Sequence, residues 1–146
     1  MDIHAARAMG TVDWVAPVVI AAIFVALMSL LREQTRLRFN AIFVAGAGSA
    51  YLSGGFGVWE FPFTAVMTYL AFRGLEDYRF IGIAWMLHVV WDVLHHFYGN
   101  PIVSFQATSS AGCAITDTLI ALWFFRGAPS VYEWRSGGTM APAPTR

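Results

Sequence analysis

Long stretches without charged side chains divide the sequence into segments of membrane-span length. Residues 14–31 carry no charge and are bounded by Asp13 and Arg32. An α-helix of this length rises by about 27 Å, which is enough to cross the hydrocarbon core of a bilayer. The run is long for the apolar region of a signal peptide, and no small-residue cleavage site follows it. We therefore expect a retained membrane-spanning helix.

Two longer apolar stretches each have room for a pair of helices. Residues 39–72 contain Glu60 as their single charge and a Ser-Gly-Gly-Phe-Gly turn signal at 53–57. Residues 80–125 are broken by the Gly-Asn-Pro run at 99–101. The pattern predicts an all-α membrane helical bundle with five transmembrane helices, near 14–31, 35–53, 57–75, 79–98 and 108–126.

The distribution of arginine predicts the orientation of the bundle. Cytoplasmic segments of membrane proteins are enriched in Lys and Arg. With five spans and the N-terminus outside, the inner side holds eight arginines, while the outer side holds Arg7. A four-helix alternative, which fuses 39–59 into one span and leaves 60–79 as a loop, gives six against three. The rule favours five spans and a cytoplasmic C-terminus.

Composition supports the same class of protein. Hydrophobic residues make up 58% of the chain and charged residues 12%, against about 25% charged in soluble domains. This excludes disorder, nucleic-acid binding and an ordinary soluble enzyme. We expect a bilayer partner, multi-pass location in a bacterial inner membrane, one domain over 1–135 and a disordered tail over 136–146. Trp14, Trp59 and Tyr98 fit an interfacial aromatic belt. A homo-oligomer stays an open alternative.

One predicted helix concentrates titratable side chains in the pattern H-x-x-W-D-x-x-H-H. At about 100° per residue, His88, Asp92 and His95 fall within about 60° of one another, and His96 lies farther round. His88 and His95 are separated by about 10 Å of helical rise, so a single ion cannot bind both. A second helix must complete any site.

Two acidic residues on neighbouring helices are placed to complete such a site. From the topology, Asp117 should lie at the level of His88, and Glu60 at the level of His95. No Lys or Arg occurs between Arg79 and Arg126. An unpaired charge in a bilayer costs at least about 2.5 kcal/mol. A metal ion, an imidazolium or protons on the carboxylates must therefore compensate the acids.

The residue types favour a metal. His and Asp suit zinc or a first-row metal such as iron, and the single Cys113 excludes a thiolate-rich site. Asp92 and Glu60 are candidates for acid–base catalysis. The predicted metal ligands are His88, Asp92, His95, His96 and Asp117.

The outer loop over 98–110 is polar but uncharged, which disfavours anionic substrates. A metal-dependent hydrolase acting on a neutral lipophilic substrate is our first interpretation. A proton or cation conductor using His88, Asp92 and His95, and a structural subunit with a polar oligomer interface, remain alternatives. A bis-histidine haem would require a dimer, because the histidines within the predicted spans all lie on one helix.

The H-x-x-W-D-x-x-H-H helix, the following Tyr-Gly-Asn-Pro-Ile at 98–102 and the segment over 108–117 resemble a family of small uncharacterised bacterial integral membrane proteins. This resemblance, carried by the C-terminal third, implies a multi-pass fold and no assigned activity. The His and Asp residues are also similar to those of intramembrane zinc hydrolases of the ceramidase and progestin-receptor type. This chain departs from them in having five predicted spans rather than seven and in crowding its histidines on one helix.

Overall fold

Five α-helices account for most of the chain in the computed structural model, which describes residues 9–52 and 54–132. No strand occurs within these ranges. This confirms the all-α prediction, and each helix overlaps the one expected from the sequence. The helices are α1 (Thr11–Ser29), α2 (Glu33–Gly48), α3 (Glu60–Gly74), α4 (Tyr78–Tyr98) and α5 (Ser109–Phe125), with a short 3-10 helix, η1 (Gly57–Trp59), before α3.

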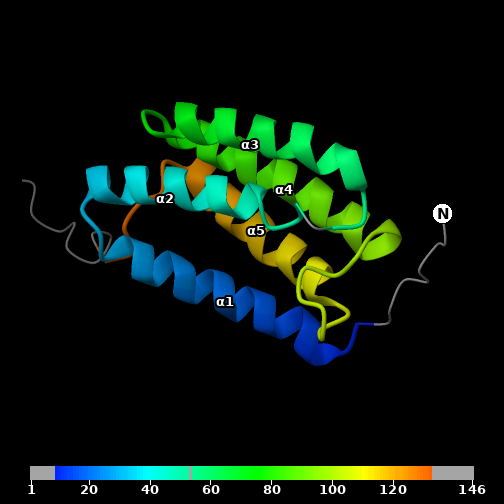
Figure 1. Cartoon of the computed structure of the whole chain (residues 1–146). Coiled ribbons are helices and arrows are strands. Elements are labelled where there is room, and N and C mark those ends of the chain that lie inside the picture. The colour runs from blue at the N-terminus through cyan, green and yellow to red at the C-terminus, as the bar shows by residue number, and fades with distance from the viewer. Residues whose placement is uncertain (1–8, 53, 133–146) are drawn as a thin grey trace, which may run out of the picture.

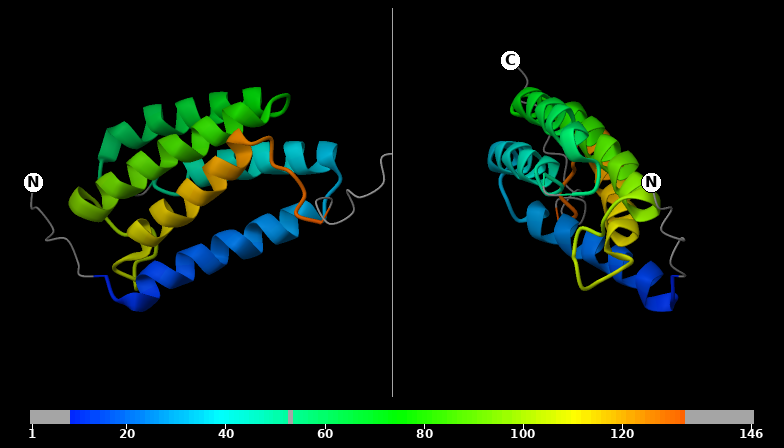
Figure 2. Two further views of the ribbon diagram at one scale, coloured as in Figure 1. Left: turned by 180° about the vertical axis from the view of Figure 1, so that it is seen from behind. Right: turned by 45° about the vertical axis from the view of Figure 1, so that its right-hand side comes forward.

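The central pair of the bundle is α4 and α5, which have the most extensive mutual contact. Helix α3 packs on α4, α2 packs on both α3 and α4, and α1 packs on α5 (Figure 1). The views in Figure 2 show α1 and α2 diverging from their shared turn. We call the end with the α1–α2 and α3–α4 turns the arginine end. The opposite end, with the α2–α3 connection and the loop over 99–108, is the loop end.

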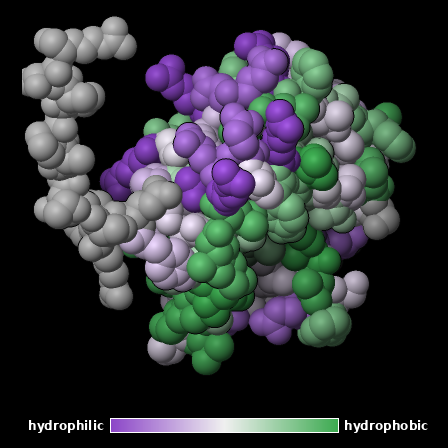
Figure 3. Space-filling model, turned by 90° about the vertical axis from the view of Figure 1, so that its left-hand side faces the viewer, coloured by the Kyte–Doolittle hydropathy of each residue, from purple (hydrophilic) through white to green (hydrophobic). Residues whose placement is uncertain are grey.

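Charged side chains gather at the arginine end. All the arginines in the described ranges lie there, namely Arg32, Arg36, Arg38, Arg73, Arg79 and Arg126. Figure 3 views this end and shows its hydrophilic surface beside strongly hydrophobic side chains. Asp77 caps α4 here by accepting a hydrogen bond from the backbone N–H of Arg79 at 2.8 Å.

Two helices, α1 and α4, are long and apolar enough to cross a membrane. Helices α2, α3 and α5 are shorter, at 16, 15 and 17 residues. The prediction of five membrane spans is therefore supported only in part by helix length. Large apolar side chains are nevertheless exposed on all five helices, for example Ile20, Ile42, Phe61, Val90 and Leu122.

The two halves of the interior differ in chemistry. Toward the arginine end the core is largely apolar, with Met67, Ile81 and Phe124 fully buried, although Asn40 is buried there too. Close helix contact depends on glycine there, because a Cβ on Gly82 would lie 2.9 Å from the ring of Phe125. Toward the loop end, buried polar and acidic side chains replace the apolar ones.

The clearest departure from the expected elements is the end of α2. The sequence predicted a helix to residue 53, but α2 ends at Gly48 and the chain continues in turns. This change of direction brings Tyr51 into the bundle, where it is 2% exposed. Pro17 lies inside α1, six residues after the helix begins at Thr11.

Candidate metal centre

Three buried side chains meet where α4 and α5 pack together. His88 and Asp92 come from α4 and Asp117 from α5, and the structure leaves them 2%, 0% and 6% exposed. His88 Nδ1 lies 2.9 Å from Asp117 Oδ2 and 3.3 Å from Asp92 Oδ2. One ligand atom from each residue lies within 4.8 Å of the other two. We refer to these three residues as the triad.

The imidazole of His88 is held in one orientation by the backbone of α2. Its Nε2 lies 3.0 Å from the carbonyl oxygen of Ala47. A carbonyl only accepts hydrogen bonds, so Nε2 carries a proton and donates it. Nδ1 is then directed at the two carboxylates. This is the usual arrangement of a metal-binding histidine, in which the second ring nitrogen donates to a carbonyl or carboxylate.

The carboxylate of Asp92 has one engaged oxygen and one without a hydrogen bond. Oδ1 lies 2.8 Å from the hydroxyl of Tyr51, which itself lies 2.9 Å from Ser110 Oγ. Because an ionised carboxylate only accepts, the Tyr51 proton points to Asp92 and Ser110 donates to Tyr51. Oδ2 accepts no hydrogen bond and faces His88. A buried oxygen of this kind is expected to have a partner, such as a proton or an ion.

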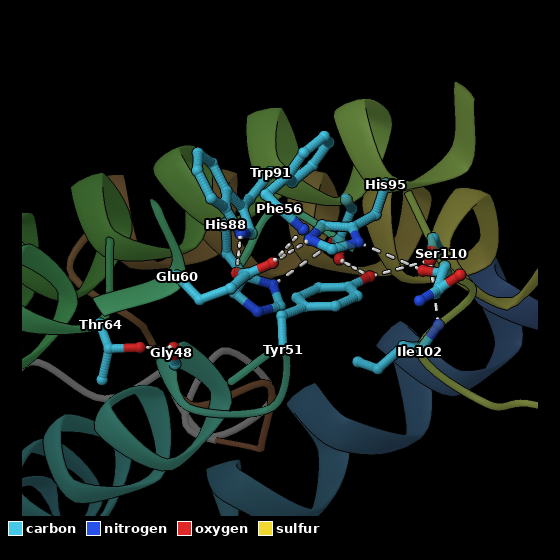
Figure 4. A network of polar contacts seen from close by, with 12 residues as sticks. Gly48, Tyr51, Phe56, Glu60, Thr64, His88, Trp91, His95, Ile102 and Ser110 are labelled. Carbon is cyan, nitrogen blue, oxygen red and sulfur yellow. Dashed lines mark hydrogen bonds and ion pairs between the residues drawn. The ribbon is translucent and has the colours of Figure 1, made fainter. Parts of the chain in front are cut away.

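A second buried pair lies nearer the loop end. Glu60 Oε1 is 3.0 Å from His95 Nε2, at ion-pair distance although not aligned as a hydrogen bond, and it accepts from the N–H of Phe56 at 3.2 Å. Oε2 accepts from the indole of Trp91 at 2.8 Å. His95 Nδ1 donates to the carbonyl of Asn100 at 3.2 Å. Figure 4 shows Glu60 between Trp91 and His95, with Tyr51 beside the imidazole.

The triad and the Glu60–His95 pair differ in their balance of acidic and basic groups. Glu60 faces one imidazole, so an imidazolium at His95 would balance it. In the triad, two carboxylates face the one imidazole of His88. Even a protonated His88 would leave one negative charge uncompensated, and buried charges require a partner. The triad therefore needs one further positive charge, from a proton or from a metal ion.

The spacing of the triad fits a metal ion. Donor atoms about 2.1 Å from a tetrahedral ion stand about 3.4 Å from one another. The two distances from His88 Nδ1 are 2.9 and 3.3 Å. One nitrogen and two carboxylate oxygens are a donor set that zinc and first-row metals accept, and three protein ligands leave a coordination position open.

The sequence matches a family of unknown function, DUF6010, over residues 12–130. The chain belongs to this family. No curated protein matches it. No solved structure matches it. Membership agrees with the expected resemblance to an uncharacterised family. It supplies no activity, so only the residues of this DUF6010 chain itself indicate its function.

The DUF6010 chain distributes the expected site residues over two places. His88, Asp92 and Asp117 come together, with Asp117 beside His88 as the helix levels predicted. His95 pairs with Glu60, also at the expected level. His96 is half-buried, with its ring against Phe97, and belongs to neither group.

Sequence reasoning missed Tyr51, Ser110 and the carbonyl of Ala47. Tyr51 fell within the helix expected over 35–53 and Ser110 within the uncharged polar stretch over 98–110, and neither was assigned a role at the site. The available signals were a tyrosine two residues before a Gly-rich turn and the serines at the start of α5. Neither signal identifies a partner without the fold.

Two cavities in this DUF6010 chain adjoin the polar residues. One, of about 330 Å³, lies at the loop end and is lined by Tyr51, Gly54 and Asn100 among others. The second, of about 320 Å³, lies between α1 and α5 and reaches Asp117. The triad thus has empty space beside Asp117, which a buried structural ion pair would not require.

Proposed function

We propose that this protein is a multi-pass integral membrane protein that binds one divalent metal ion, zinc or iron, at His88, Asp92 and Asp117. We further propose that it hydrolyses a neutral lipophilic substrate there. The observation that carries the proposal is the triad itself, in which two buried carboxylates face one imidazole and Asp92 Oδ2 accepts no hydrogen bond. A metal ion would supply the missing positive charge.

Exposed apolar side chains support the membrane location. Soluble proteins rarely present large contiguous apolar surfaces, whereas exposed Ile, Val, Leu and Phe side chains occur here on every α-helix. Trp14 and Trp59, 57% and 67% exposed, lie toward the loop end, where interfacial aromatic residues are expected. The clustering of arginine at the opposite end supports a cytoplasmic position for that end.

The chain's own residues would prepare the site for hydrolysis. A bound divalent ion supplies a water of lowered pKa and polarises a carbonyl oxygen. His88 is oriented by Ala47, and Asp92 by the hydroxyl of Tyr51. Asp117, through the carboxylate oxygen that does not hold the ion, would take the proton released when water attacks and would return it to the leaving group. Glu60 is held in its own pair, so this proposal assigns it no step.

Elemental analysis of protein purified in mild detergent tests the metal proposal. We expect about one zinc or iron per chain in the wild type, as for a single metal site. Asp117→Asn and Asp92→Asn should lose the metal, because each removes a charged ligand. His96→Gln is the matched control, since His96 lies on the same helix outside the triad, and it should retain the metal.

A second set of measurements separates ligand loss from misfolding. Circular dichroism and size-exclusion chromatography should show the same helix content and size for Asp117→Asn as for the wild type. A folded Asp117→Asn protein with unchanged metal content would refute the site, as would a wild-type protein that stays metal-free after growth with added zinc and iron.

One observation favours a second candidate, a proton conductor. Contacts run from Glu60 through His95 and Tyr51 to Asp92, His88 and Asp117, with ring stacking rather than a hydrogen bond between His95 and Tyr51. Beyond the triad toward the arginine end the core is largely apolar, with Asn40 as a buried polar side chain, so this route covers only part of the bundle. A His88-dependent proton flux in liposomes would favour conduction over hydrolysis.

A further inference from the structure

The cavity between α1 and α5 forms a groove that leads to the triad. Helix α1 lines it with Ala16, Pro17 and Ile20, and α5 lines it with Gly112, Cys113 and Asp117. Its volume of about 320 Å³ lies within the range of small-molecule sites, about 300–1,000 Å³. Most of this lining is apolar or small, and Asp117 is its contact with the metal centre.

Asp117 belongs to the groove and to the triad at the same time. Its Oδ2 lies 2.9 Å from His88 Nδ1, while the residue also lines the groove. A molecule in the groove would therefore lie against a proposed metal ligand. Helix α1 is otherwise weakly packed, because only 11% of its apolar membrane-length stretch is buried. The groove therefore lies at the edge of the bundle rather than in its core.

The charged side chains that line the groove determine which polar head group a ligand can carry. Its two charged side chains are Asp13 and Asp117, and its described lining contains no arginine or lysine. Asp13 is already engaged, accepting from the Thr108 hydroxyl at 2.6 Å and from the backbone N–H of Gly10 at 2.9 Å. An anionic group would lie near Asp13 and would find no Arg or Lys partner in the groove. Thr108 and Gln106 offer neutral polar groups at the outer end.

We infer that this groove binds a single-chain amphiphile with an uncharged polar group, which enters from the outer leaflet of the bilayer. The polar group is directed to Asp117 and the alkyl chain lies against α1. The inference rests on the proposed function, because it takes the triad as the reacting centre. It names the substrate class and the route by which the substrate arrives.

Alkylation of Cys113 provides a direct test, since it is the single cysteine of the chain and lines the groove. The protein is reconstituted in lipid nanodiscs and treated with N-ethylmaleimide. Dodecanol at ten times its dissociation constant should slow alkylation about tenfold, by mass action. Dodecanoate, which has the same chain length and a negative charge at neutral pH, should leave the rate unchanged.

Two tryptophan substitutions on α1 locate the binding site. Ala16→Trp would fill the groove, so dodecanol should no longer change the alkylation rate. Ala22→Trp is the matched control, because Ala22 lies on the same helix and lines a different cavity. It should retain full protection by dodecanol.

Equal protection by dodecanol and dodecanoate would overturn the head-group selectivity, and no protection by either would overturn the groove. Metal content measured on the same samples reports separately on the proposed function. A metal-loaded protein without protection would refute the groove alone, whereas a protected but metal-free wild type would refute the metal centre alone.

Discussion

The ring of Tyr51 stacks on the imidazole of His95, with centroids 3.9 Å apart and an interplanar angle of 13°. The hydroxyl of the same tyrosine lies 2.8 Å from Asp92 Oδ1. Tyr51 thus joins the Glu60–His95 pair to the triad, although it comes from the connection between α2 and α3. Its ring and its hydroxyl have separate partners, so their roles can be separated by mutation.

Tyr51→Phe should weaken metal binding without unfolding the bundle. The phenylalanine ring can still stack on His95, but Asp92 loses the hydroxyl that orients it. Removing such an outer contact of a metal ligand typically weakens affinity by about 10- to 100-fold. A competition titration against a chelator measures this change. Tyr98→Phe, at a side chain that is 42% exposed, is the control and should bind metal normally.

Glu60→Gln should lower stability while the metal content stays unchanged. Glu60 contacts His95 and Trp91 rather than the triad, so its charge is not part of the metal centre. Removing the charged acceptor of the part-buried Trp91 and Phe56 N–H groups weakens their hydrogen bonds, which costs about 1–3 kcal/mol. Thermal unfolding in detergent and elemental analysis of the same protein measure both quantities. Loss of metal from folded Glu60→Gln would contradict the division into two groups.

Gly99→Ala should destabilise the loop end. A Cβ at this position would lie 2.5 Å from His95 Nδ1 and 3.1 Å from its Cα, and His95 cannot move away because Tyr51 stacks on it. Overpacking of this kind costs about 1–3 kcal/mol. In the control, Gly46→Ala, the new Cβ meets nothing within 4 Å and α2 gains a better helix former. Its melting temperature should be equal or higher.

Labelling with a membrane-impermeant maleimide tests the topology. In a Cys113→Ser background, Ser104→Cys should react from outside intact cells, whereas Gln34→Cys should react only after permeabilisation. Both positions are exposed, and they lie at opposite ends of the bundle. The four-span alternative places them on the same side of the membrane, so labelling of both from one side would refute five spans.

The helices were predictable because charged residues or Gly-rich turns separate the apolar stretches of this sequence. The pairings of His88 with Asp117 and of Glu60 with His95 followed from the levels of antiparallel helices. The sequence did not indicate whether His95 or His96 would pair with Glu60, because both lie near one helical face. Only the packing of α3 on α4 places Glu60 beside His95. The role of Tyr51 depends on the early end of α2, which no local periodicity specified.

Helix α1 contributes no side chain to the described contacts of the triad or of the Glu60–His95 pair; these come from residues between Ala47 and Asp117. Helix α1 instead forms one side of the apolar groove that reaches Asp117. Under the proposed function, the metal ligands and the α1 side of the substrate groove would therefore lie in different stretches of the chain. Relatives that keep residues 47–117 and vary their first helix would carry out the same chemistry on differently shaped molecules.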